Sequence, residues 1–144
     1  MNAGSAGADP RLGLSVSHRR YVPYSHAHYA GNLVDGAYSL ACFGDVATEV
    51  CIRTDGDEGL FASYSEVVFH APVRAGDVLE VTATVVRVGR RSRELEFTAT
   101  VLCRGRAGCE DAAPDGPAPG AADVLDPPIL ATSARGTVVV PARG

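Results

Sequence analysis

The segment from His28 to Ile52 most constrains what this chain can fold into, because it is almost entirely apolar and its polar residues have helical spacing. At about 100° per residue, the polar side chains gather within roughly 120° of the helix circumference. This stripe carries Asp35, Tyr38, Ser39, Cys42, Asp45, Val46, Glu49 and Arg53. Other parts of the protein must therefore cover most of the helix, and the stripe faces a neighbouring surface or cavity.

Carboxylates on such an apolar helix require a physical reason, because an ionised acid taken out of water is destabilising unless it is paired or neutralised. Asp45 and Glu49 lie one turn apart on the stripe, and we predict them as site residues whose pKa is raised by burial. Asp35 has a simpler interpretation as an acid at the helix N-terminus, with Asn32 as the N-cap. Glu49 can also pair with Arg53 at i, i+4 spacing.

Most of the remaining chain is predicted to form strands, because its segments alternate between apolar and polar residues and are rich in β-branched side chains. These segments are residues 12–17 before the helix and 65–71, 77–88, 93–103 and 129–140 after it. Residues 89–92 are predicted to connect two of them as a hairpin. Two segments of small and polar residues predict a disordered leader at 1–10 and a mobile loop at 104–123.

The order β-α-β-β-β-β predicts an α+β protein with the hotdog fold, in which a curved antiparallel sheet wraps around one long central helix. Residues 11–144 are then a single hotdog domain. A sheet of this order leaves an edge strand unpaired, so we expect a homodimer or a higher even oligomer.

Composition excludes several classes of partner and cofactor. The net charge is −4, which argues against a nucleic-acid partner, because such a partner normally requires a basic stripe. Cys42, Cys51, Cys103 and Cys109 lack metal-site spacing, so we expect free thiols, no metal and no cofactor. The N-terminus lacks a secretory leader and no apolar run approaches the roughly 20 residues of a membrane span. We therefore expect a cytoplasmic protein with no membrane contact.

Two groups of motifs carry a resemblance to known families. Residues 69–81 and 86–92 resemble the second half of hotdog thioesterases and dehydratases. The stretches His28–Gly36, Phe43–Glu49 and Asp55–Phe61 resemble the 3-aminobutyryl-CoA ammonia lyases, and the resemblance covers about residues 12–141. It extends to related enzymes of actinobacterial isonitrile lipopeptide and β-amino macrolactam pathways, which add glycine instead of ammonia.

This resemblance implies a lyase that adds an amine, glycine or ammonia, to Cβ of a 2-enoyl-CoA or 2-enoyl-carrier-protein thioester, with thioester hydrolysis able to follow. Backbone N–H groups at the start of the helix would stabilise the enolate that forms. Glu49 or Asp45 would take a proton from the amine and return one to Cα, and His28 would orient the carbonyl or share the proton transfer. The expected substrate-binding residues are Asn32, Leu33, Val34, Asp35, Gly36, Tyr38 and Arg53.

Glycine as the nucleophile would require a partner for its carboxylate, and a guanidinium offers a planar bidentate one. We expect one of Arg19, Arg20, Arg53 and Arg135 to serve. The alternative function is an acyl-CoA or acyl-carrier-protein thioesterase, in which the same helical acid activates water. A third alternative is an acyl-binding module whose acids are purely structural.

Overall fold

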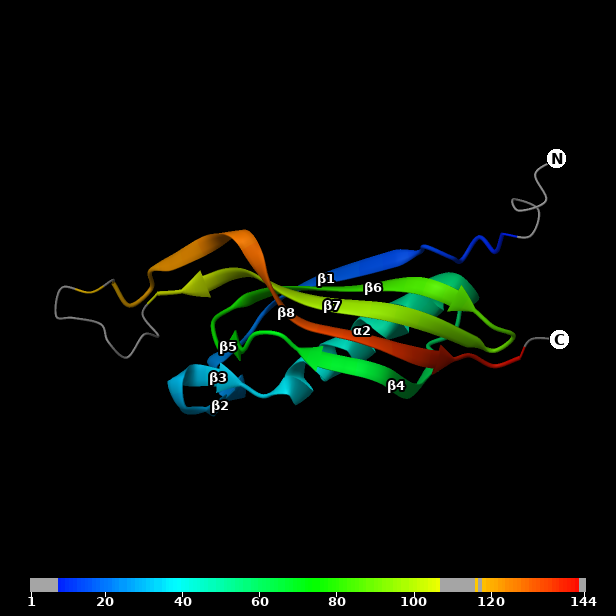
Figure 1. The fold of residues 1–144 in the computed structure, drawn as a ribbon, viewed down its shortest axis with the longest axis horizontal. Coiled ribbons are helices and arrows are strands. Elements are labelled where there is room, and N and C mark those ends of the chain that lie inside the picture. The colour runs from blue at the N-terminus through cyan, green and yellow to red at the C-terminus, as the bar shows by residue number, and fades with distance from the viewer. Residues whose placement is uncertain (1–7, 107–115, 117, 143–144) are drawn as a thin grey trace.

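The computed structural model describes residues 8–106, 116 and 118–142, and shows a five-stranded antiparallel sheet curved around one long helix (Figure 1). This is the hotdog architecture that the sequence predicts. The elements are β1 (Ser15–Tyr21), η1 (Tyr24–His26), β2 (Ala27–Tyr29), η2 (Ala30–Asn32), β3 (Leu33–Val34), α2 (Gly36–Asp55), β4 (Leu60–Phe69), β5 (Val73–Arg74), β6 (Val78–Val88), β7 (Ser92–Gly105) and β8 (Ala122–Val139).

The helix α2 begins at Gly36, not directly after Asn32, which corrects the predicted N-cap. Asp35 caps the helix, and its Oδ1 accepts a hydrogen bond of 3.2 Å from the backbone N–H of Tyr38. Asn32 instead lies in a turn with a φ of 60°, and its carbonyl accepts the N–H of Ala75 at 2.9 Å. Asn and Asp are both good N-caps, so local preference alone does not choose between them.

Strand pairing makes that choice. Leu33 and Val34 form β3, which pairs with Arg74 and Val73 of β5, so the chain stays extended for two residues after Asn32. These two residues were predicted to belong to the first helical turn, and the structure places them in a strand instead.

The buried side of α2 packs against the concave face of the sheet, as the apolar pattern predicts. Its buried residues are Ser39, Cys42, Phe43, Val46, Ala47, Val50 and Cys51. The ring of Phe43 stacks on Phe97 of β7, with centroids 5.0 Å apart. The helix ends at Asp55, and its C-cap Gly56 has a φ of 66°, the left-handed conformation that glycine adopts without strain.

The five-stranded sheet has the order β1-β6-β7-β8-β4, and β6 and β7 alternate buried residues with half-buried or exposed ones. Several strand bounds differ from the predicted ones, and β4 runs from Leu60 to Phe69 where residues 65–71 were predicted. β1 reaches Tyr21, and β7 and β8 extend to Gly105 and from Ala122, into the segment predicted as a mobile loop. Residues 107–115 and 117 of that segment, and residues 1–7 of the predicted leader, lie outside the described part of the chain.

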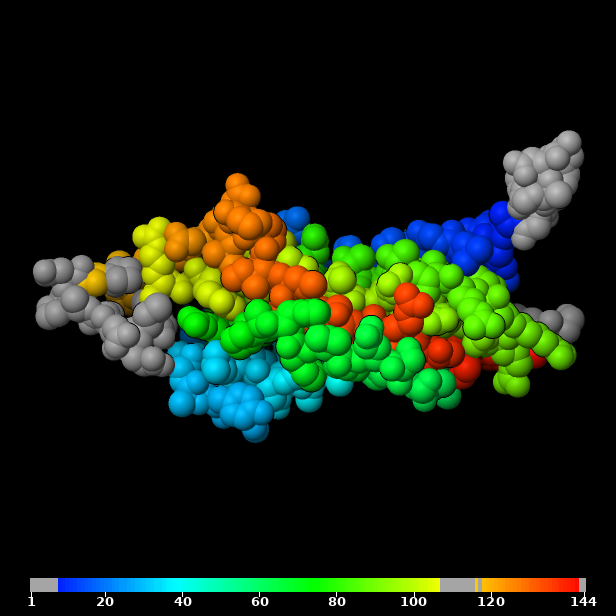
Figure 2. Space-filling model, viewed as in Figure 1, coloured from blue at the N-terminus to red at the C-terminus, as the bar shows by residue number. Residues whose placement is uncertain are grey.

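A second, three-stranded sheet of order β2-β3-β5 lies beside the N-terminus of α2. Its strands β2 and β3, with η1 and η2, form the bulge coloured light blue in Figure 2. The strand β4 is an edge of the main sheet and exposes Leu60, Val68 and Phe69. Within the described residues, no helix is both long and apolar enough to cross a membrane.

Candidate active site

A pocket of about 400 Å³ opens beside the N-terminus of α2. Residues from four parts of the chain line it: the β2–α2 segment, β4, the loop into β5, and β8. They are Tyr29, Val34, Asp35, Gly36, Ser39, Phe69, His70, Ala71, Pro72, Val73 and Thr132. Three of the predicted substrate-binding residues, Val34, Asp35 and Gly36, therefore line one pocket.

The start of α2 offers backbone donors to this pocket. The first N–H groups of an α-helix have no acceptor within the helix. The N–H of Tyr38 is one of them, and it donates to the side chain of Asp35. Gly36 and Ala37 occupy the first two helical positions, so their N–H groups point out of the N-terminus. A side chain at Gly36 would come within 2.5 Å of the Phe69 ring, so this ring packs directly against the helix start.

His28 lies on the same side of the molecule as this pocket. It belongs to β2, its side chain is 59% exposed, and its Nδ1 is 3.8 Å from Oδ2 of Asp35. Asp45 and Glu49 follow Asp35 by 10 and 14 residues of helix, which is about 15 and 21 Å along the axis. Within one chain, His28 is therefore separated from the two predicted acids.

The two acids instead join a group of charged residues where α2 packs on β1, which we call the β1–α2 charge cluster: His18, Arg20, Asp45, Glu49 and Arg53. His18 Nε2 lies 2.7 Å from Oε1 of Glu49, and Arg53 Nε donates to Oε2 at 2.7 Å. Arg20 donates to the carboxylate of Asp45. The i, i+4 pair of Glu49 and Arg53 is the one that the sequence predicts.

The charge state of Glu49 differs from the prediction. Its side chain is 34% exposed, and hydrogen bonds from His18 and Arg53 lower its pKa below the ordinary value. The predicted rise by burial is therefore wrong for Glu49: its two partners stabilise the carboxylate more than burial destabilises it. Asp45 is 58% exposed.

Sequence reasoning missed His18 as a site residue, and it named Arg20 only as a candidate partner for a glycine carboxylate, not as the partner of Asp45. Val16, His18 and Arg20 alternate with exposed residues, so His18 and Arg20 share the face on which Val16 is buried. Ending the predicted strand at residue 17 hid this signal. The pocket residues from β4 and β8, such as Phe69 and Thr132, had no signal in the local sequence.

The four candidate arginines divide between the two faces of the sheet. Arg19 pairs with Glu80 at 3.3 Å, and Arg135 contacts Glu96 at 3.0 Å, both on the face away from α2. Arg20 lies on the face of β1 that packs on α2, and Arg53 belongs to α2 itself.

Cys42, Cys51 and Cys103 are free thiols, whereas Cys109 lies outside the described residues. No group of three potential metal ligands occurs within the part of the chain that the structure describes.

Comparison with known proteins assigns the family. Residues 31–105 match the family described as the thioesterase superfamily. The chain is 48% identical over 115 residues to 3-aminobutyryl-CoA ammonia lyase from Acetoanaerobium sticklandii, an alignment that covers 80% of this chain and 85% of the relative. The chain belongs to the 3-aminobutyryl-CoA ammonia lyase-like family of hotdog proteins. It is a carbon–nitrogen lyase of the hotdog superfamily, as the motifs predict.

Solved structures agree with this family. The β-alanyl-CoA:ammonia lyase from Clostridium propionicum superposes with a TM-score of 0.82 and 32% identity, covering 91% of this chain and 87% of that one. A hexameric hotdog fold thioesterase of Campylobacter jejuni superposes with a TM-score of 0.65 and 24% identity, covering 95% and 86%. This second likeness shows the fold alone.

Proposed function

We propose that this lyase forms and breaks the C–N bond at Cβ of a 3-aminoacyl thioester, by adding an amine to the 2-enoyl thioester and by the reverse elimination. The observation that carries the proposal is its 48% identity to an enzyme named as 3-aminobutyryl-CoA ammonia lyase, together with 32% identity to a β-alanyl-CoA:ammonia lyase. CoA thioesters are the first substrates to test, because both relatives are named for them. Carrier-protein thioesters are the alternative substrates.

The pocket at the start of α2 supports binding of the thioester carbonyl. Attack of an amine at Cβ places negative charge on the carbonyl oxygen, as an enolate. The N–H group of Gly36, with the positive end of the helix dipole, is positioned to stabilise that charge. Val34, Phe69 and Val73 give the pocket apolar walls for the acyl group.

The proton transfers are assigned to Glu49, with Asp45 as the alternative. The partners of Glu49 keep it ionised at neutral pH, so it is ready to accept a proton from the attacking ammonium-derived amine. The proton is then returned to Cα, which leaves the enzyme unchanged and balances the reaction. In the elimination direction the same carboxylate removes the Cα proton as the amine departs.

One protomer cannot supply all of these groups to one substrate. Glu49 follows Gly36 by 13 helical residues, or about 20 Å, whereas Cα and Cβ are the atoms adjacent to the thioester carbonyl. The proposed site therefore combines the α2 N-terminus and His28 of one protomer with Glu49 of a second. Edge strand β4, with exposed Val68 and Phe69, offers the surface on which two sheets could join.

Glycine is the second candidate amine, and the surroundings of the Arg20 guanidinium favour it. Its Nε is buried and lacks a hydrogen-bond partner among the described residues, while its terminal nitrogen holds Asp45. The guanidinium also lies beside the hydroxyl of Tyr38. A glycine carboxylate could use the spare donor, and this narrows the four candidate arginines to Arg20, with Arg53 as the alternative.

The test is incubation of the purified protein with crotonyl-CoA, or with a crotonyl carrier protein, plus ammonium or glycine. Mass spectrometry should detect the 3-amino or N-carboxymethyl-3-amino thioester. Release of free CoA without any amine adduct would favour the thioesterase alternative. Substitution Arg20→Gln should reduce use of glycine more than use of ammonium, and an equal effect on both amines would remove the glycine proposal.

A further inference from the structure

The pocket at the N-terminus of α2 contains two buried hydroxyl groups to which the proposed proton transfers assign no role. Ser39 of α2 and Thr132 of β8 are each 2% exposed, and both line the pocket. Thr132 Oγ1 donates to Ser39 Oγ at 3.2 Å. A hydrogen-bonded hydroxyl pair thus lies beside the apolar walls of the pocket.

The proton of Ser39 is not used in this arrangement. A hydroxyl in a helix commonly donates to the carbonyl one turn earlier, and Thr48 and Thr54 do so at 2.9 and 3.0 Å. Within the described part of the chain, Ser39 Oγ only accepts from Thr132. A buried hydroxyl with an unused donor is stabilised by a further acceptor, and the pocket is where a ligand could supply one.

The position along the helix indicates which part of a ligand would lie there. Ser39 follows Gly36 by three residues, so the two share one face of α2 and are about 4.5 Å apart along the axis. A thioester whose carbonyl accepts from the N–H of Gly36 would place its Cβ, two bonds farther on, beside the hydroxyl pair.

We infer that Ser39 and Thr132 form a polar subsite that selects acyl groups with an amino or hydroxyl substituent at Cβ over plain hydrocarbon chains. This inference rests on the proposed binding of a thioester in this pocket. The Ser39 hydroxyl donates to a hydroxyl or neutral amino substituent. The lone pair of Ser39 Oγ that Thr132 leaves free accepts from a hydroxyl or from either protonation state of the amino group. A hydrocarbon acyl group leaves the donor of Ser39 unpaired, which weakens its binding.

The test compares the dissociation constants of 3-hydroxybutyryl-CoA and butyryl-CoA by calorimetry, with mass spectrometry to check that both ligands remain intact. We expect the full-length protein to bind the hydroxylated ligand about three- to tenfold more tightly, as one net hydrogen bond allows. The Ser39→Ala and Thr132→Val double variant should bind both ligands equally. Thr98→Val, on the exposed face of β7, is the matched control and should keep the preference.

The inference is overturned if the wild-type protein shows no preference, or if the double variant keeps it. Thermal unfolding of each variant establishes that the proteins compared are folded, and Ser39→Ala alone provides a milder substitution if the double variant is unstable. Because neither ligand is an enoyl thioester, binding is measured apart from amine addition. A preference without lyase turnover would refute the proposed function and leave the subsite standing.

Discussion

His18 Nε2 lies 2.7 Å from Oε1 of Glu49, so a residue of β1 positions a carboxylate of the central helix. With Arg53 on the other oxygen, this contact fixes the side chain in place and lowers its pKa. Substitution of His18 therefore tests what sets the pKa of Glu49.

Replacing His18 by Ala should raise the pKa of Glu49 towards its ordinary value. The native carboxylate is favoured by this partner, so the acidic limb of the pH profile for kcat/KM should move to higher pH in the variant. Carbon-detected NMR titration of Glu49 measures the same shift directly. Arg19→Gln, which removes an exposed pair with Glu80 on the other face of the sheet, is the control and should leave the profile in place.

Glu49→Gln should lower kcat for amine addition by about 100- to 10,000-fold, the range typical of removing a general base. Asp45→Asn should have a smaller effect if Glu49 carries the proton. Steady-state assays with crotonyl-CoA and ammonium decide between the two acids. A Glu49→Gln enzyme with full activity and a strongly impaired Asp45→Asn enzyme would transfer the role to Asp45.

Asp35→Ala should destabilise the protein by about 1 kcal/mol, because it removes the N-cap of α2. Asn32→Gly should change stability by no more than about 0.5 kcal/mol, since Asn32 has a positive φ that glycine adopts freely and does not cap the helix. Chemical denaturation of both variants measures the difference. Equal losses would restore Asn32 as the cap.

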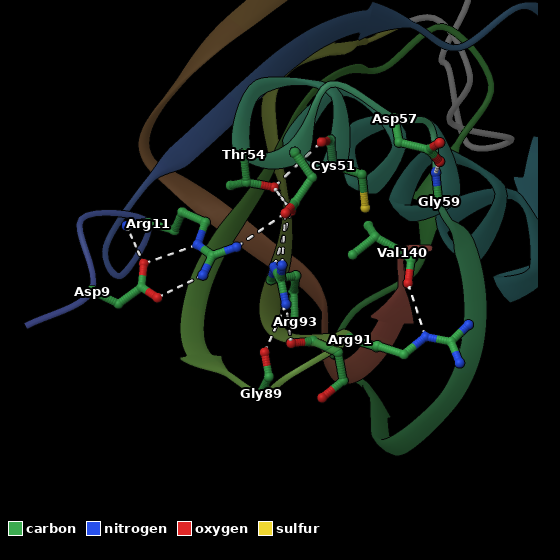
Figure 3. A network of polar contacts seen from close by, with 12 residues as sticks. Asp9, Arg11, Cys51, Thr54, Asp57, Gly59, Gly89, Arg91, Arg93 and Val140 are labelled. Carbon is green, nitrogen blue, oxygen red and sulfur yellow. Dashed lines mark hydrogen bonds and ion pairs between the residues drawn. The ribbon is translucent and has the colours of Figure 1, made fainter. Parts of the chain in front are cut away.

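Arg93→Met should destabilise the protein by about 3 kcal/mol, because Arg93 is buried and forms an ion pair with Asp55 at the end of α2. Figure 3 shows its guanidinium between the helix end and the β6–β7 turn, where it also donates to the carbonyl of Gly89 at 2.9 Å. Arg106→Met, which removes an exposed pair with Asp123, should change the stability much less than Arg93→Met does. A similar small loss in both variants would show that burial adds nothing to the Arg93 pair.

The same network predicts a dependence on pH. Burial raises the pKa of Asp55, but the hydrogen bonds of Arg93 and Thr54 outweigh it and hold the pKa below its ordinary value. Because the folded-state pKa is depressed, the contribution to stability is present above the ordinary carboxyl value of about 3.9 and is lost as pH falls below it. Melting curves from pH 7 to 3 should therefore drop more steeply for wild type than for Asp55→Asn.

The sequence by itself determined the central helix, the order of the strands and the family motifs, because apolar periodicity and local motifs are properties of neighbouring residues. It also placed Asp35 at the helix N-terminus and paired Glu49 with Arg53, since both relations span at most one or two helical turns. The sequence did not determine where α2 starts. Asn32 and Asp35 are equally suitable N-caps, and the pairing of β3 with β5 decides between them.

Only the tertiary structure decided the composition of the site. It brought Phe69 and Thr132 to the helix start, joined His18 to Glu49, and separated His28 from both predicted acids. These relations depend on strand register and on which face of the sheet a side chain occupies, and a shift of one residue would reverse that face. The charge of Glu49 follows from the same long-range contacts, because partners distant in the sequence, more than burial, set its pKa.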